Sequence, residues 1–293
     1  MVRPTLQNGS CSAVPSMRRC IGTASPSGYI QNLIGDKRMS EDFRSRYEAV
    51  RERAFEFEGM TGELSVAIFL ALLDLQRENG VTGHFAEFGV YQGRSAAIVL
   101  GDVGESETLA LVDWSAHPKL DRLAAISTRF RMFKGSSEKM STDKDLLSLL
   151  DAGVRFSHHD ASHSFSNVAT EMALMENRIR PRGLMVLDDY GSIAYMQVIA
   201  ACFHHLYTKD SQLEILLHAD NKAYLCRRAD FPFYAPFVLE RLPALLRGAG
   251  LDCYLARTEN DSRYRGFSLA RKRAPTDPDL YGLNIWGDQF YKL

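Results

Sequence analysis

Three aspartates follow two predicted strands near the middle of the chain. Asp160 comes after the predicted strand 154–158. Asp188 and Asp189 come after the predicted strand 184–187. In an open parallel sheet the carboxyl ends of neighbouring strands line one crevice, so these carboxylates can meet although they are distant in sequence. Carboxylates in one crevice repel one another unless a cation lies between them, and oxygen ligands suit Mg²⁺, with Mn²⁺ or Ca²⁺ as substitutes. The sequence therefore predicts a divalent-cation site, with helix capping in a solvated turn as the alternative.

A glycine turn precedes these acids. The apolar run 84–88 is followed by Gly89 and Gly93, and Ser95 opens the next predicted helix. Glycines let the backbone approach a ligand, and the unpaired amides of a helix N-terminus face it. Three residues separate the two glycines, which does not fit the dinucleotide fingerprint G-x-G-x-x-G and argues against a nicotinamide oxidoreductase. The turn is therefore a candidate ligand site, with a plain strand–turn–helix joint as the alternative.

A further acid, Asp113, ends the apolar run 107–113. A carboxylate at the carboxyl end of the second strand of such a sheet can accept hydrogen bonds from both hydroxyls of a ribose. We therefore predict that Asp113 anchors a nucleoside, with a helix cap as the alternative.

Four segments in this order resemble the macrocin O-methyltransferase family. These segments are residues 87–95, 160–165, 180–183 and 188–191, and the resemblance covers residues 80 to 210. The family is a group of metal-dependent natural-product and sugar O-methyltransferases within class I, whose members use S-adenosylmethionine. The resemblance implies an α/β fold with a Rossmann-like sheet, mostly parallel with an antiparallel last strand, and with helices on both faces.

The same resemblance implies a set of site residues. The S-adenosylmethionine site would comprise Glu87, Gly89, Tyr91, Gly93, Ser95, Asp113, Trp114, Ser136 and Asp160. Ser136 follows the predicted strand 131–134, which in this family passes near the adenine, although a serine in that position is more often a helix cap. Asp160, Asp188 and Asp189 would hold Mg²⁺.

Two positions depart from the family pattern and leave the general base open. Relatives often have a second acid two residues after the one that matches Asp160, where this chain has Ser162. Others have a histidine two residues after the acidic pair, where this chain has Gly191. We predict His163 as the catalytic base, because the ordinary pKa of histidine suits proton removal near neutral pH, and Asp160 as a residue that shares the role. The alternative is that His163 orders the turn or binds the amine end of the cofactor.

The resemblance implies a Mg²⁺-assisted transfer of a methyl group from S-adenosylmethionine to a hydroxyl of a small natural-product or sugar-type acceptor. Two alternatives remain open. One is a metal-independent N- or O-methyltransferase in which Asp188 and Asp189 are structural. The other is a catalytically silent S-adenosylmethionine-binding paralogue that acts as a scaffold.

Composition narrows the class of protein. The 293 residues are 45% hydrophobic, and 35 basic against 36 acidic residues give a formal net charge of -1. These values predict a globular protein and give no electrostatic reason to expect nucleic acid or a membrane as a partner. The five cysteines form no C-x-x-C pair, and the longest apolar stretch, 66–73, is too short to cross a bilayer. We therefore expect a cytoplasmic protein.

The chain is expected to have four regions. These are a disordered tail (1–35), an N-terminal helical extension (36–80), the S-adenosylmethionine-binding domain (81–229) and a C-terminal addition (230–293). The helix expected at 64–76 is apolar nearly all round, which predicts burial against the sheet or a second subunit, and hence a homodimer or higher homo-oligomer. In the last region we expect a helix around 238–247 and a hairpin of strands 251–256 and 265–270. The aromatic end, 275–293, is a candidate lid over the site.

Overall fold

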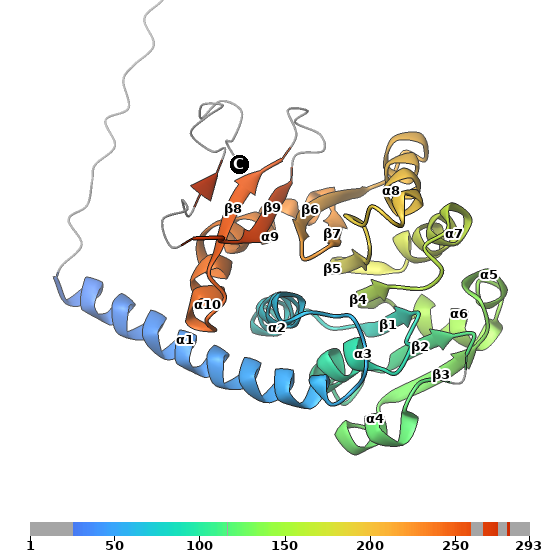
Figure 1. Ribbon diagram of the computed structural model, residues 1–293, viewed down its shortest axis with the longest axis horizontal. Helices are drawn as coiled ribbons and strands as arrows, with labels where there is room; N and C mark the ends of the chain where they lie inside the picture. The colour runs from blue at the N-terminus through green and yellow to red at the C-terminus, as the bar shows by residue number, and fades with distance from the viewer. Residues whose placement is uncertain (1–25, 116, 259–265, 275–279, 282–293) are drawn as a thin grey trace, which may run out of the picture. The chain divides into compact units, whose positions relative to one another are not determined.

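The computed structural model describes residues 26–115, 117–258, 266–274 and 280–281 of the chain. Ten strands in these residues form one mixed sheet (Figure 1). The strands are β1 (His84–Phe88), β2 (Leu109–Asp113), β3 (Phe130–Lys134), β4 (Val154–His159), β5 (Ile179–Leu187), β6 (Leu213–Ala219), β7 (Lys222–Arg227), β8 (Cys253–Arg257), β9 (Phe267–Arg271) and β10 (Leu280–Tyr281). Their order across the sheet is β10-β8-β9-β6-β7-β5-β4-β1-β2-β3.

The first five strands are parallel, as predicted. β1 lies between β2 and β4, and β5 continues the parallel part beyond β4. β7 pairs antiparallel with β5, and β6 pairs antiparallel with β7. The Rossmann-like fold class expected from the sequence is therefore confirmed, with the carboxyl ends of β1, β2, β4 and β5 at one edge.

Helices cover both faces of the sheet, because the central strands are buried on both sides and read as continuous apolar runs. One core contains side chains of α1 (Pro26–Phe55) from residue 43 onward, α2 (Glu63–Glu78), α3 (Arg94–Val99), α4 (Leu120–Ile126), α9 (Phe231–Pro236) and α10 (Leu242–Gly248). The other contains side chains of α5 (Ser137–Met140), α6 (Lys144–Asp151), α7 (Phe165–Glu176) and α8 (Met196–Thr208). Side chains of β1 alternate between the two cores: Phe85 belongs to the first and Phe88 to the second.

The apolar helix expected at 64–76 is α2, and its surface is buried within the chain. Every side chain from Val66 to Leu73 has zero exposure. This burial accounts for the apolar surface that suggested a second subunit, so α2 gives no reason to expect a dimer. The oligomeric state stays a prediction.

The C-terminal region continues the same sheet. The expected hairpin is present as antiparallel β8 and β9, and β9 pairs parallel with β6. The helix expected around 238–247 is α10, preceded by a π-helical segment, Phe237–Arg241. Residues 39–293 form one compact unit. The four expected regions stay a prediction, and most of the candidate lid, 275–279 and 282–293, lies outside the described residues. No helix among the described residues has the length and apolarity needed to span a membrane.

Candidate active site

The glycine turn after β1 contacts the end of β4. Gly89 has a φ of +84°, and a Cβ atom there would lie 2.0 Å from the carbonyl oxygen of Asp160. The Asp160 amide donates to the carbonyl of Phe88 at 2.7 Å. Only glycine allows this approach, so Gly89 brings the turn and Asp160 together. Gly93, with a φ of +104°, begins α3 and packs toward Leu123.

Asp113 at the end of β2 holds the same turn in place. Its Oδ2 accepts hydrogen bonds from the amides of Val90 and Tyr91 at 2.8 and 3.0 Å. Its Oδ1 accepts from the amide and hydroxyl of Ser115, both at 2.7 Å. Burial disfavours the charge, but these four bonds outweigh it and lower the pKa of Asp113 below its usual value. Asp113 is therefore an ionised carboxylate that fixes the loops after β1 and β2.

A cavity of about 370 Å³ opens above these loops. Six of the predicted cofactor residues line it: Gly89, Tyr91, Asp113, Trp114, Ser136 and Asp160. The remaining three do not. Gly93 lies at the start of α3, and the buried Ser95 hydroxyl donates to the buried Glu87 carboxylate behind the turn. Ser136 also caps α5, accepting from the Lys139 amide, as the helix-cap alternative predicted, and its contact with the cofactor stays a prediction.

The rim of this cavity is apolar and open. Met60 and Trp114 are 84% and 78% exposed, and Tyr91 is 43% exposed. Large apolar side chains that line a cavity while remaining accessible are suited to contact a ligand. The sequence reasoning missed Met60, which lies in the loop before α2, because an isolated methionine in a loop carries no pattern.

Beside the cavity, His163 lies between two of the predicted carboxylates. Its Nε2 is 3.0 Å from Oδ1 of Asp160 and 3.0 Å from Oδ2 of Asp189. All three side chains are partly accessible. Burial disfavours the imidazolium, but the hydrogen bond to Asp160 and the charges of both aspartates raise the pKa of His163 above its usual value. His163 and Asp189 have positive φ values, +53° each, a strained conformation that often marks functional turns.

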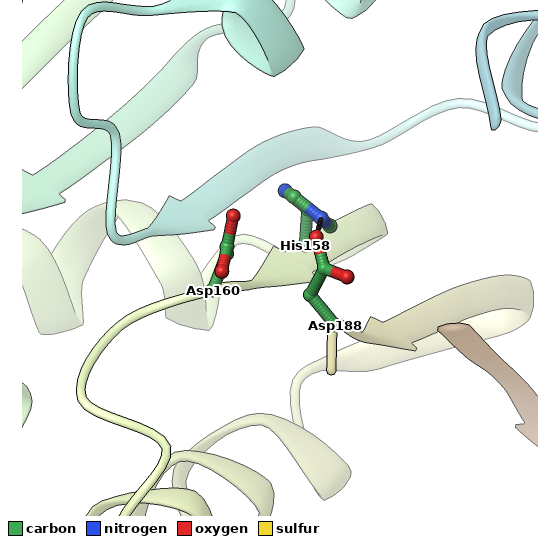
Figure 2. Close-up of side chains that lie close together, drawn as sticks. All are labelled: His158, Asp160 and Asp188. Atoms are coloured by element: carbon green, nitrogen blue, oxygen red, sulfur yellow. Dashed lines mark ion pairs between the residues drawn. The ribbon is translucent and has the colours of Figure 1, made fainter. Parts of the chain in front are cut away.

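The Asp188 carboxylate points toward the His158 ring, as Figure 2 shows. Its Oδ2 is 3.3 Å from Nε2 of His158, an ion-pair contact that does not meet hydrogen-bond geometry. The other ring nitrogen of His158 is 3.1 Å from Oε1 of Glu87. Burial disfavours the imidazolium, yet Asp188 and Glu87 raise the pKa of His158 to about 9. His158 thus connects β1, β4 and β5 at their carboxyl ends.

Two residues of the β6–β7 hairpin complete the cluster, and the sequence reasoning missed both. Asn221 Nδ2 donates to Oδ1 of Asp189 at 2.8 Å. The Lys222 ammonium donates to Oδ2 of Asp188. Burial opposes ionisation of Asp188, but His158 and Lys222 hold the pKa of this carboxyl well below its usual range. The available signal was a lysine at the start of an otherwise apolar strand.

The donor set fits a divalent cation. Ligand atoms of Asp160, His163 and Asp189 lie within 4.8 Å of one another, and so do those of His158, Asp160 and Asp188. Asp160 belongs to both groups, whereas Asp188 and Asp189 fall in different groups, so the three predicted metal ligands do not form one group among the described residues and their shared cation stays a prediction. Oδ2 of Asp160 has no protein partner among the described contacts, and this oxygen is the kind of ligand that Mg²⁺ prefers.

A second cavity, also about 370 Å³, adjoins the first and shares Ser162 and His163 with it. Its other lining residues are Ser164, Ile193, Ala194, Tyr195, Met196 and Gln197. The Tyr195 ring stacks on His163, with centroids 4.3 Å apart. Ile193 and Met196 are 95% and 70% exposed. His163 therefore lies between two adjoining cavities, one at the glycine turn and one with a lining of mixed polarity.

Residues 86–190 match a family model described as a methyltransferase domain. No curated protein matches the chain. The matched segment contains the glycine turn, Asp113 and all three aspartates of the cluster. The resemblance to methyltransferases expected from the sequence is therefore confirmed, whereas the domain bounds 81–229 stay a prediction.

Solved structures with a similar fold include three methyltransferases. The O-methyltransferase NovP is 13% identical, with a TM-score of 0.49, over 58% of this chain and 81% of that one. CalS11, a TDP-rhamnose 3'-O-methyltransferase of calicheamicin biosynthesis, is 15% identical, with a TM-score of 0.45, over 64% and 94%. MycE, from the mycinamycin pathway and in complex with Mg and SAH, is 15% identical, with a TM-score of 0.44, over 62% and 54%.

Proposed function

We propose that this chain, whose residues 86–190 form a methyltransferase domain, transfers a methyl group from S-adenosylmethionine to a hydroxyl of a small acceptor. The observation that supports this most is the pair of adjoining cavities that share His163. A transfer reaction needs a donor site and an acceptor site that meet at the reacting atoms. The glycine-turn cavity is the donor site, and the Tyr195 cavity is the acceptor site.

The donor site would hold S-adenosylmethionine through the residues predicted for it. Asp113 is ionised, and its oxygens already accept four hydrogen bonds, so a ribose hydroxyl would take the place of the bond from the Ser115 hydroxyl. Trp114 and Tyr91 offer exposed aromatic rings at the rim. Asp160 lies where the donor cavity meets the cluster and would face the methionine end of the cofactor.

His163 would accept the proton of the acceptor hydroxyl. Its ring lies between the two cavities, and Asp160 and Asp189 fix its orientation. Alignment of the acceptor oxygen with the sulfonium methyl accounts for much of the barrier reduction in such a transfer. Mg²⁺, held by Asp160, Asp188 and Asp189, would lower the pKa of the acceptor hydroxyl and fix its position.

The lining of the acceptor cavity favours an uncharged, partly apolar acceptor. Ile193, Tyr195 and Met196 contribute apolar surface, and none of the described lining residues is Lys or Arg. A phosphate-bearing acceptor would need several cationic partners, and His163, which is already paired with two aspartates, is the one basic side chain in this lining. We therefore propose a hydroxylated natural-product-type acceptor, such as a phenol or an uncharged glycoside.

Isothermal titration calorimetry of the full chain with S-adenosylhomocysteine, and separately with NAD, tests the donor site. We expect binding of S-adenosylhomocysteine alone. Asp113→Asn should weaken this binding about tenfold or more, because it removes the charge that accepts the ribose hydroxyls. The matched control is Asp121→Asn at an exposed position of α4, which should bind like the wild type. Absence of S-adenosylhomocysteine binding by the wild type would refute the proposal.

Two measurements distinguish the remaining alternatives, which are a metal-independent methyltransferase and a silent scaffold. The ion pair between Lys222 and Asp188 favours, as a second candidate, a methyltransferase that works without metal. Methyl transfer that persists undiminished in EDTA would select that candidate. Cofactor binding without turnover on any phenol or glycoside would instead select the silent scaffold.

A further inference from the structure

Lys222 is a buried lysine at the centre of the candidate cation site. The residue is 3% exposed and is the first residue of β7, where it pairs with Ala219 of β6. Its ammonium contacts Oδ2 of Asp188, and Asp188 is itself 8% exposed. Burying a charged lysine is unfavourable unless a partner compensates it, so the ion pair with Asp188 is the reason that Lys222 can lie here.

We propose that Lys222 is a resident counter-ion that competes with a divalent cation for Asp188, and so sets how tightly the site binds the ion. This inference rests on the proposed cation site formed by Asp160, Asp188 and Asp189. An ammonium and a divalent cation on the same carboxylate repel each other strongly, because the surroundings are largely shielded from water. A cation that uses Asp188 must therefore displace Lys222 or bind beside it at a cost.

The β6–β7 hairpin gives Asp188 and Asp189 partners of different charge. Asp188 receives the charged ammonium of Lys222, whereas Asp189 receives the neutral amide of Asn221 at 2.8 Å. A neutral amide orients a carboxylate without opposing a cation. Asp189 and Asp160 are also the more accessible acids, with side chains 22% and 24% exposed against 10% for Asp188. The ion should therefore reach Asp160 and Asp189 first, where the His163 ring between them must turn aside or coordinate the ion, and Asp188 should bind it only after Lys222 moves away.

If the ion pair between Lys222 and Asp188 is only structural, a different change in cation affinity is expected when Lys222 is replaced. If Lys222 only stabilised the hairpin, its removal would lower the stability of the fold and leave the affinity for a cation unchanged or reduced. Competition predicts a tighter complex after removal, because Asp188 then has no ammonium partner. His158 still faces Asp188 from β4, so the carboxylate stays in place in either case.

The test is a titration of the full chain with Mn²⁺ in the presence of S-adenosylhomocysteine. Electron paramagnetic resonance measures the free Mn²⁺ at each step. We expect Lys222→Met to lower the dissociation constant of Mn²⁺ about tenfold or more. The control Lys209→Met, at an exposed position after α8, should leave it unchanged. Lys222→Gln, which keeps a hydrogen-bond donor beside Asp188 while removing the charge, gives the same prediction should Lys222→Met fail to fold.

The outcomes separate this inference from the proposed function. Equal or weaker Mn²⁺ binding by the Lys222 variants, with S-adenosylhomocysteine binding intact, would overturn the competition and leave the methyltransferase proposal standing. Absence of Mn²⁺ binding in the wild type and both variants would overturn the competition and the cation site together. Loss of S-adenosylhomocysteine binding by the wild type would refute the donor site itself.

Discussion

At the residue scale, the site depends on how individual charges are paired. His163 lies between Asp160 and Asp189, whereas Asp188 is paired with His158 and Lys222. Each anion of the cluster therefore has at least one cationic partner within the protein. This pairing allows several carboxylates to lie together at strand ends before any ion binds.

The pH dependence of turnover tests the role of His163. Since the two aspartates raise its pKa, the neutral ring that can accept a proton forms only above its usual value of 6.5, so turnover should rise with pH above that value. Asp189→Asn removes one of the anions, which lowers the pKa of His163 and should shift this rise to lower pH. His163→Gln should reduce kcat about 100-fold while cofactor affinity is retained. A pH–rate profile that is the same in all three proteins would contradict the assignment.

Gly89 offers a test of the contact between the glycine turn and β4. A Cβ atom there would overlap the Asp160 carbonyl at 2.0 Å, so Gly89→Ala should destabilise the fold by several kcal/mol, about 3 or more. The matched control is Gly80→Ala, which has a φ of +65° but no atom within 4 Å of the added Cβ. That variant should cost only about 1 kcal/mol, from backbone strain. Urea unfolding of both variants measures the difference, and equal losses would show that the contact is not what requires Gly89.

At the element scale, the sequence predicted the strands that position the acids and an antiparallel last strand, but not the contacts that the β6–β7 hairpin makes with the acids. β2 and the second half of β5 are continuous apolar runs with acidic residues at their ends, so both are visible in the pattern. β4 is mixed, with Arg155, Ser157 and two histidines, and its place follows from the acid and turn after it. The pairing of the β6–β7 hairpin beside β5 brings residues far apart in the chain into contact, and no local pattern specifies which side chains meet there. The roles of Asn221 and Lys222 follow from that pairing and could not be predicted.

The Glu176 carboxylate links α7 to α8 and to the segment before β6. This carboxylate, at the end of α7, accepts hydrogen bonds from His205 of α8 and from Ser211 and the Gln212 amide before β6, each at 2.7 Å. Burial opposes the charge, but these bonds lower the pKa of Glu176 from 4.5 to about 2. The stabilisation is therefore complete above about pH 4.5 and is lost as the pH falls toward 2.

Glu176→Gln should accordingly lower the free energy of unfolding at pH 7 by about 1 to 3 kcal/mol. The difference from the wild type should shrink when unfolding is measured at successively lower pH below 4.5, because the wild-type carboxylate then becomes protonated. Glu138→Gln, at an exposed position of α5, is the control and should have little effect at any pH. A loss that does not depend on pH would show that the charge of Glu176 is not responsible.

At the scale of the whole molecule, one sheet links the donor loops to the C-terminal strands. The order β5-β7-β6-β9-β8 runs without interruption from the cluster to the C-terminal hairpin. The sequence predicted this hairpin as part of an addition, because strand pairing between β6 and β9 depends on residues far apart in the chain. The apolar helix α2 illustrates the same limit: its composition predicted burial, but only the fold identifies the surface that it contacts.

The central claim is that a nucleoside donor and a divalent cation bind side by side at the carboxyl ends of β1, β2, β4 and β5. A crystal structure of the full chain with S-adenosylhomocysteine and Mn²⁺, with data collected at the manganese absorption edge, tests this directly. The account predicts the ribose at Asp113 and an anomalous peak in contact with Asp160 and Asp189. A cofactor bound elsewhere, or the absence of an anomalous peak among these aspartates, would contradict it.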